Sequence, residues 1–173
     1  MPEDDTRSFA DDRRRLLGEL ELERNQLLRN IETCRIRDIE RPMIEEWSLK
    51  DIVGHVASWE AEVVSALRDA QRGQRPKIFD FNEDRTDAWN QDHVERKRGL
   101  TFWSVLEQLK AGRERLLTLV SEFDDAAIGE EGRVPNRLLQ LVAYHDREHW
   151  HLIAAYLAGM PGVREVTPGA ESN

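Results

Sequence analysis

Apolar residues recur at spacings of three and four along almost the whole chain, and this helical period constrains the fold more than any other feature. No stretch alternates between apolar and polar residues for long enough to predict a β-sheet. The period predicts four long helices at residues 8–34, 48–72, 101–121 and 135–158, and one shorter helix at 83–97. We therefore expect an all-α protein built as a four-helix bundle with a crossover connection and one short extra helix.

The predicted helix boundaries carry capping residues. Ser48 precedes the second long helix, and Asp51 lies three residues later, where a capping box needs it. Asn82 and Thr101 are suited to cap the next two helices, and Gly73 is suited to end the second long one. The connection between the second and third long helices is long enough to permit a crossover, so a simple up-down-up-down order is not required.

The bulk properties narrow the class of protein. The 173 residues suffice for one domain, which we place at residues 1–162, followed by a disordered tail at 163–173. A net charge of -9 argues against nucleic acid as a partner. The sequence shows neither a signal-peptide pattern nor an apolar run approaching the roughly 20 residues that span a bilayer, so we expect no membrane contact.

The cysteine content indicates a reducing compartment. Cys34 is the single cysteine, which excludes an intramolecular disulfide and favours a cytoplasmic location. Arg35 and Arg37 would lower the pKa of this thiol if they lay against it, but an ordinary thiol near a helix end is the simpler interpretation.

His145 and His149 are the most informative residues of the last predicted helix. Their i, i+4 spacing places both on one face, within an apolar stripe, whereas His151 lies on the opposite side. Burying two neighbouring imidazoles is costly unless each finds a partner, and a metal ion binds both in their neutral form. The alternative is a pair of core histidines that bond to the backbone or to carboxylates. The zinc-protease signature His-Glu-x-x-His is absent, because residue 146 is Asp.

His55 is the candidate for a third ligand. It lies at the edge of the apolar stripe of the second long helix, beside Ile52 and Trp59. From there its imidazole could reach a cleft between helices and complete a three-nitrogen metal site with open coordination positions. The alternative is a boundary histidine with ordinary hydrogen bonds. His93 follows Trp89 at i, i+4, which predicts an aromatic contact rather than a ligand.

Other side chains near the three histidines have candidate roles. Asp51, Asp146 and Glu148 could orient the ligand histidines, with capping and solvent exposure as the default explanations. Trp59 and Trp150 could wall the cleft or simply belong to the core.

These residues resemble those of a known superfamily. The first motif is Trp47-Ser48-x-x-Asp51-x-x-x-His55-x-x-x-Trp59-Glu60, followed about ninety residues later by His145-x-x-x-His149. This order and spacing resembles the DinB/YfiT-like superfamily of metal-binding four-helix bundles, over residues 8–161. The further segments Phe79-Asp80-Phe81-Asn82, Trp89-Asn90 and Thr101-Phe102 look like those of its ClbS/DfsB-type members.

The resemblance implies a metal site and a range of activities. It implies that His55, His145 and His149 bind a divalent transition metal, commonly nickel or zinc, in a bundle of unusual topology that often forms homodimers. Characterised relatives include transferases and isomerases that use bacillithiol, mycothiol or glutathione, and proteins that inactivate genotoxic small molecules.

Three functions remain open at this stage. The first is a metal-dependent thiol transferase or detoxifying enzyme, in which the metal binds a low-molecular-weight thiol as thiolate for attack on a small electrophile. The second is a hydrolase of a small molecule, for which Asp146 and Glu148 are the candidate bases. The third is a non-catalytic stress or resistance protein that sequesters a ligand or metal. The sequence assigns no catalytic residue and identifies neither the metal nor the substrate.

Overall fold

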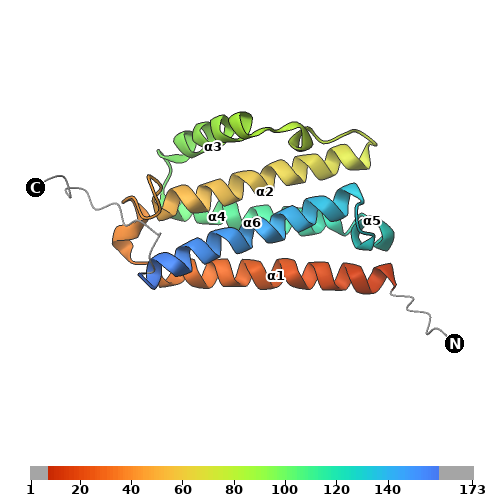
Figure 1. Cartoon of the computed structure of the whole chain (residues 1–173), viewed down its shortest axis with the longest axis horizontal. Helices are drawn as coiled ribbons and strands as arrows, with labels where there is room; N and C mark the ends of the chain where they lie inside the picture. The colour runs from red at the N-terminus through yellow and green to blue at the C-terminus, as the bar shows by residue number, and fades with distance from the viewer. Residues whose placement is uncertain (1–7, 160–173) are drawn as a thin grey trace, which may run out of the picture.

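The computed structural model describes residues 8–159, which are helical apart from their connections and one isolated bridge between Ile44 and Trp47 (Figure 1). The α-helices are α1 (Phe9–Thr33), α2 (Leu49–Gln71), α3 (Glu83–Lys97), α4 (Phe102–Val120), α5 (Asp125–Gly129) and α6 (Val134–Leu157). Two 3₁₀-helices, η1 (Ile36–Ile39) and η2 (Lys77–Asp80), lie in the connections before and after α2. The all-α prediction is confirmed. The tail predicted at residues 163–173 lies outside the described residues.

The helices begin at the capping residues that the sequence indicates. Ser48 Oγ accepts a hydrogen bond from the Asp51 amide, and the Asp51 carboxylate accepts one from the Ser48 amide, which completes the capping box. Asn82 and Thr101 cap α3 and α4 through their side-chain oxygens. Gly73, which follows α2, has a φ of 69° that only glycine adopts at no steric cost.

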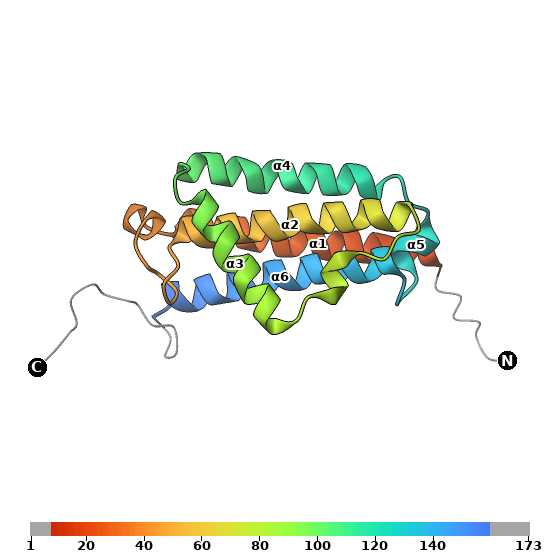
Figure 2. The same ribbon diagram turned by 90° about the horizontal axis from the view of Figure 1, so that it is seen from above.

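The four long helices form two parallel pairs. α2 packs against α4 and both run in the same direction, while α1 packs against α6 and both run in the opposite direction (Figures 1 and 2). Because α2 and α4 are parallel neighbours, the chain must return along the bundle between them, and the segment carrying η2 and α3 does so across the outside of α2 (Figure 2). The predicted crossover is therefore present.

Among the described residues, none of the helices is long and apolar enough to cross a membrane.

The buried apolar side chains form two clusters, one towards each end of the bundle. We call them the α5-side core and the η1-side core, after the short helices beside them. The α5-side core includes Leu16, Leu20, Val63, Leu67, Leu116, Ile128, Leu138 and Val142. The η1-side core includes Leu27, Ile31, Ile52, Val56, Leu109 and Ile153.

The short helix α5 was not predicted, because the helices expected at 101–121 and 135–158 leave the residues between them as a connection. Asp124 caps this helix by accepting from the Ala127 amide, and Ile128 is fully buried. A five-residue helix is too short for a helical period to show in the sequence. Gly129 at its end packs directly against α1, where an added Cβ would overlap the Phe9 carbonyl.

Candidate metal centre

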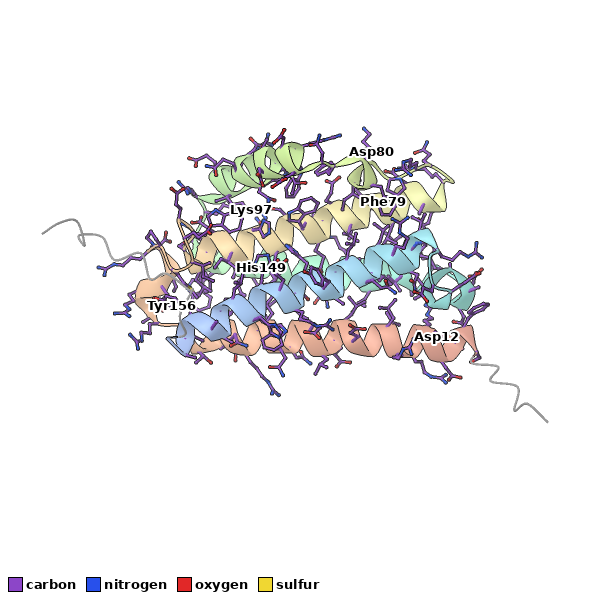
Figure 3. The ribbon with its side chains drawn as sticks, in the orientation of Figure 1. Asp12, Phe79, Asp80, Lys97, His149 and Tyr156 are labelled. Atoms are coloured by element: carbon purple, nitrogen blue, oxygen red, sulfur yellow. The ribbon has the colours of Figure 1, made fainter. Side chains whose placement is uncertain are left out.

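Three histidines converge between α2 and α6. His55 Nε2 lies 2.9 Å from His145 Nε2, and His149 Nε2 lies 3.0 Å from the same atom. One nitrogen from each ring lies within 4.8 Å of the other two, which identifies the group as a possible metal site. Figure 3 labels His149 on α6, facing the neighbouring α2.

Helix geometry explains this convergence. His145 and His149 are one turn apart on α6, so their rings project from the same face, with centroids 4.5 Å apart. α2 packs against this face and contributes His55, whose ring centroid lies 4.8 Å from that of His145 and 4.9 Å from that of His149. The Trp47 ring, 4.7 Å from that of His55, packs beside it at the start of α2.

All three imidazoles are held neutral. Burial lowers the pKa of His55 to about 3 and that of His149 to about 4, because a protonated ring loses its hydration there. Burial lowers the pKa of His145 too, and the other two histidines and Arg24 act in the same direction. Near neutral pH each ring therefore has one nitrogen without a proton, and its lone pair is available to a metal.

The short distances between the three imidazole nitrogens fit a shared cation better than they fit hydrogen bonds between the rings. A neutral imidazole nitrogen carries either one proton or one lone pair, so it forms one good hydrogen bond. His145 Nε2 faces two other nitrogens at hydrogen-bonding distance, so at least one of these contacts is unfavourable without a third partner. A divalent transition metal would accept all three lone pairs, and imidazole is a preferred ligand of zinc and nickel. The donor set therefore fits the metal that the sequence predicts.

The three histidines line a cleft of about 540 Å³. Trp59 on α2 lines it, as do side chains of η2, α3 and the loop between them, while α6 forms the opposite wall. Trp150 does not contribute, because its Nε1 donates to Glu23 Oε2 on α1, away from this cleft. Of the two tryptophans considered from the sequence, only Trp59 forms part of the cleft.

Comparison with known proteins identifies the family. Residues 19–153 match the family model of the DinB superfamily. The chain belongs to the DinB superfamily. Its fold is similar to that of a crystal structure of an uncharacterised protein from Escherichia coli UTI89, with a TM-score of 0.73, 12% sequence identity, and coverage of 85% of this chain and 93% of that one. At this identity the similarity shows the fold alone. Among proteins of curated function, none matches the chain.

Next to the histidines of this DinB-superfamily bundle, four charged side chains form a buried network that we call the charged quartet. Its members are Arg24, Glu60, Arg113 and Asp146, one from each long helix and each at most 9% exposed. Arg24 binds both oxygens of Asp146 at 3.0 Å and reaches Glu60 Oε2 at 2.5 Å. Arg113 donates to Asp146 Oδ2 at 2.8 Å and to Glu60 at 3.0 and 3.2 Å.

The charged quartet was not predicted from the sequence. Each member interrupts the buried stripe of its helix, between residues of the α5-side core and residues of the η1-side core. The only sign of the charged quartet in the sequence is a charged residue at a core-facing position of each long helix. The pairing itself was hidden, because the partners lie between 33 and 122 positions apart.

The carboxylates considered from the sequence have different surroundings. Asp51 caps α2, which is its default explanation. Asp146 is fully buried and both of its oxygens accept from arginines, so it is poorly placed to serve as a base. Glu148 is exposed and lines the cleft, and none of the ion pairs within residues 8–159 involves it.

The remaining candidates lie outside the metal centre. Cys34 Sγ bonds to the Asn30 carbonyl, and burial, assisted by Asp38, raises the pKa of this thiol to about 12, as expected of an unreactive thiol. His93 stacks on Trp89 at 3.7 Å, the predicted aromatic contact. His151 is exposed, in agreement with its predicted place on the far side of the helix.

Proposed function

We propose that this DinB-superfamily protein binds one divalent transition metal, zinc or nickel, through His55, His145 and His149, and acts with it on a small molecule in the adjoining cleft. The observation that carries this proposal is the convergence of three neutral imidazole nitrogens at the wall of an open cleft. When bound, such a metal supplies a positive charge with vacant coordination positions that attract an anion such as a thiolate.

The protein's own residues hold the site and shape its access. Trp47 packs against His55 and restricts rotation of that ring. The charged quartet fixes Asp146, and with it the turn of α6 that carries His145. The apolar side chains of the cleft wall lower the effective dielectric constant beside the histidines, which strengthens electrostatic interactions there.

We favour thiol transfer to a small electrophile as the reaction, in line with the thiol-dependent transferases among the characterised relatives that the resemblance to the DinB/YfiT-like superfamily implies. A transfer of this kind needs a metal with an open position and a cleft for the electrophile, but no protein base. The alternative is hydrolysis of a small molecule, and its supporting observation is Glu148, a carboxylate that lines the cleft beside His149. Sequestration of a ligand without turnover is the outcome if neither activity is found.

Elemental analysis of protein purified without a histidine tag tests the metal site. We expect about one zinc or nickel ion per chain in the wild type and almost none in the double variant His145→Ala/His149→Ala. His151→Ala is the matched control, since it removes an exposed histidine of the same helix and should leave the metal content unchanged. Full metal retention in the double variant would refute the proposal.

Turnover assays separate the two reactions. Metal-loaded protein would be mixed with a panel of cellular thiols and a generic electrophile, with metal-free protein and His145→Ala as controls. We expect thiol consumption only with the metal-loaded wild type. Equal rates in all three samples, together with metal-dependent cleavage of an ester, amide or strained ring in the absence of thiol, would favour the hydrolase.

A further inference from the structure

One side of the cleft is a rigid aromatic surface next to the histidines. Trp59 lies 4.3 Å from Trp89 and 5.6 Å from Phe81 between ring centroids, and 6.4 Å from His145. Its Nε1 donates to Asn90 Oδ1 at 2.8 Å, which fixes the orientation of the indole. Phe81, Trp89 and Asn90 belong to the segment that crosses the outside of α2, so Trp59 is held from that side (Figure 2).

The opposite wall exposes apolar side chains towards the same space. Leu141 and Tyr144 on α6 line the cleft, yet 45% and 59% of their surfaces are exposed. Large apolar side chains are usually buried, so exposed ones that line a cleft need an explanation. A cleft with an aromatic wall on one side and an apolar wall on the other is typical of ligand sites. A flat ring inserted here would contact apolar groups on both of its faces.

The charged side chains that line the cleft are all acidic. Its charged lining residues are Glu60, Asp146 and Glu148, and the arginines of the charged quartet neutralise the first two. No lysine or arginine among residues 8–159 lines it; Arg85 stacks on Phe81 at 4.4 Å from the ring centroid, outside the lining. In the metal-free protein, a negatively charged group beside Trp59 would thus find no cationic side chain in the lining and would be repelled by Glu148.

We propose that the space between Trp59 and α6 binds a small molecule through a flat apolar ring system that bears no negative charge. The ring lies against the Trp59 indole, which leaves the rest of the molecule directed along the cleft towards His145. The inference names the substrate class of the site described under the proposed function. It rests on that function only for the reaction, because ring binding requires no metal.

Three probes with the same ring and different charges test this: naphthylmethanol, naphthylmethylammonium and naphthoate. Their dissociation constants would be measured by calorimetry on the full chain, both as purified and after chelation. We expect naphthoate to bind the chelated protein about tenfold more weakly than the other two. Trp59→Leu should weaken naphthylmethanol binding about tenfold, whereas Trp103→Leu, at a tryptophan that is 70% exposed on α4, should not.

A second variant keeps the test decisive if Trp59→Leu does not fold. Leu141→Lys changes an exposed side chain of the opposite wall, and it should bring naphthoate binding up to that of naphthylmethanol. Glu148→Gln should weaken the cationic probe about threefold. The naphthoate effects are expected after chelation, and the effects of Trp59→Leu and Glu148→Gln on the neutral and cationic probes are expected with or without metal. A protein that lacks metal would therefore refute the proposed function and leave this inference standing.

Two results would overturn the inference. One is naphthoate binding as tight as the neutral probe in the chelated wild type, together with no effect of Leu141→Lys. The other is no binding of any probe while Leu141→Lys lowers the molecular mass measured by sedimentation, which would assign the cleft to a second copy of the chain.

Discussion

His145 is the residue on which the other two histidines converge. Its Nε2 contacts both neighbours, at 2.9 and 3.0 Å, whereas His55 and His149 each face it from one side. The three rings are buried together, and a protonated imidazole there would lose its hydration. The nearby carboxylates of the charged quartet would stabilise that charge little, because both are already paired with arginines. The cost of burying them must therefore appear in the stability of the metal-free fold.

That cost predicts a pH dependence of the metal-free protein. In the unfolded chain a histidine titrates near its ordinary pKa of 6.5, but in the folded chain His55 titrates at about 3 and His149 at about 4. Between these values the unfolded state binds more protons, so the free energy of unfolding decreases as the pH falls. From about pH 7 to about pH 5 we expect a loss of roughly 2 kcal/mol for each of these two histidines.

Denaturant unfolding in the presence of a chelator, repeated across this pH range, would measure the effect. The variant His145→Ala/His149→Ala retains only His55 in the centre and should show a clearly shallower dependence. Equal slopes in the variant and the wild type would show that the histidines are not responsible.

The long helices and the convergence of the three histidines follow from local rules, which is why the sequence could predict them. Capping residues mark the starts of α2, α3 and α4, and the i, i+4 spacing fixes the relative direction of His145 and His149. That His55 lies at the edge of its stripe indicated that it faces a neighbouring helix. The short helix α5 could not be predicted in the same way, because it depends on a close tertiary contact with α1 that no local sequence pattern reveals.

Two glycine substitutions test this contact between α1 and α5. Gly129→Ala would push a Cβ into the Phe9 backbone, and we expect a loss of roughly 2 kcal/mol because two helices must move apart. Gly18→Ala is the matched control in the exposed middle of α1, where an added Cβ meets nothing within 4 Å. It should instead gain up to about 1 kcal/mol from helix propensity. Thermal unfolding of both variants would measure this, and a stabilised Gly129→Ala would contradict the close approach.

In the molecule as a whole, the three-histidine group and the charged quartet join the two parallel helix pairs. His55 comes from the α2/α4 pair, whereas His145 and His149 come from the α1/α6 pair. The charged quartet takes two members from each pair and lies between the α5-side core and the η1-side core. Apolar packing also joins the pairs, because each core takes side chains from all four long helices. The polar contacts add directional links between the pairs at the position where the two cores meet.

Metal removal should therefore destabilise the whole bundle. The ligands come together only in the folded state, so binding adds to the free energy of unfolding by mass action, by about 4 kcal/mol at a thousandfold excess over the dissociation constant. We expect a clear drop in melting temperature after chelation, restored by added zinc or nickel. An unchanged melting temperature, with loss of metal verified by elemental analysis, would show that the metal does not link the helix pairs.

Removing one arginine of the charged quartet should destabilise the protein far more than removing an exposed one. Arg24→Met leaves Asp146 and Glu60 to share Arg113, which places an uncompensated negative charge in the core and should cost about 3–5 kcal/mol. Arg72→Met, which breaks an exposed pair, should cost less than about 1 kcal/mol. The double variant Arg24→Met/Asp146→Asn restores the charge balance and should recover part of the loss.

Because the Asp146 turn also carries His145, both Arg24 variants should bind metal more weakly than Arg72→Met. Denaturant unfolding and metal titration would measure the two effects, and equal values for Arg24→Met and Arg72→Met would exclude the charged quartet as a link between the helix pairs.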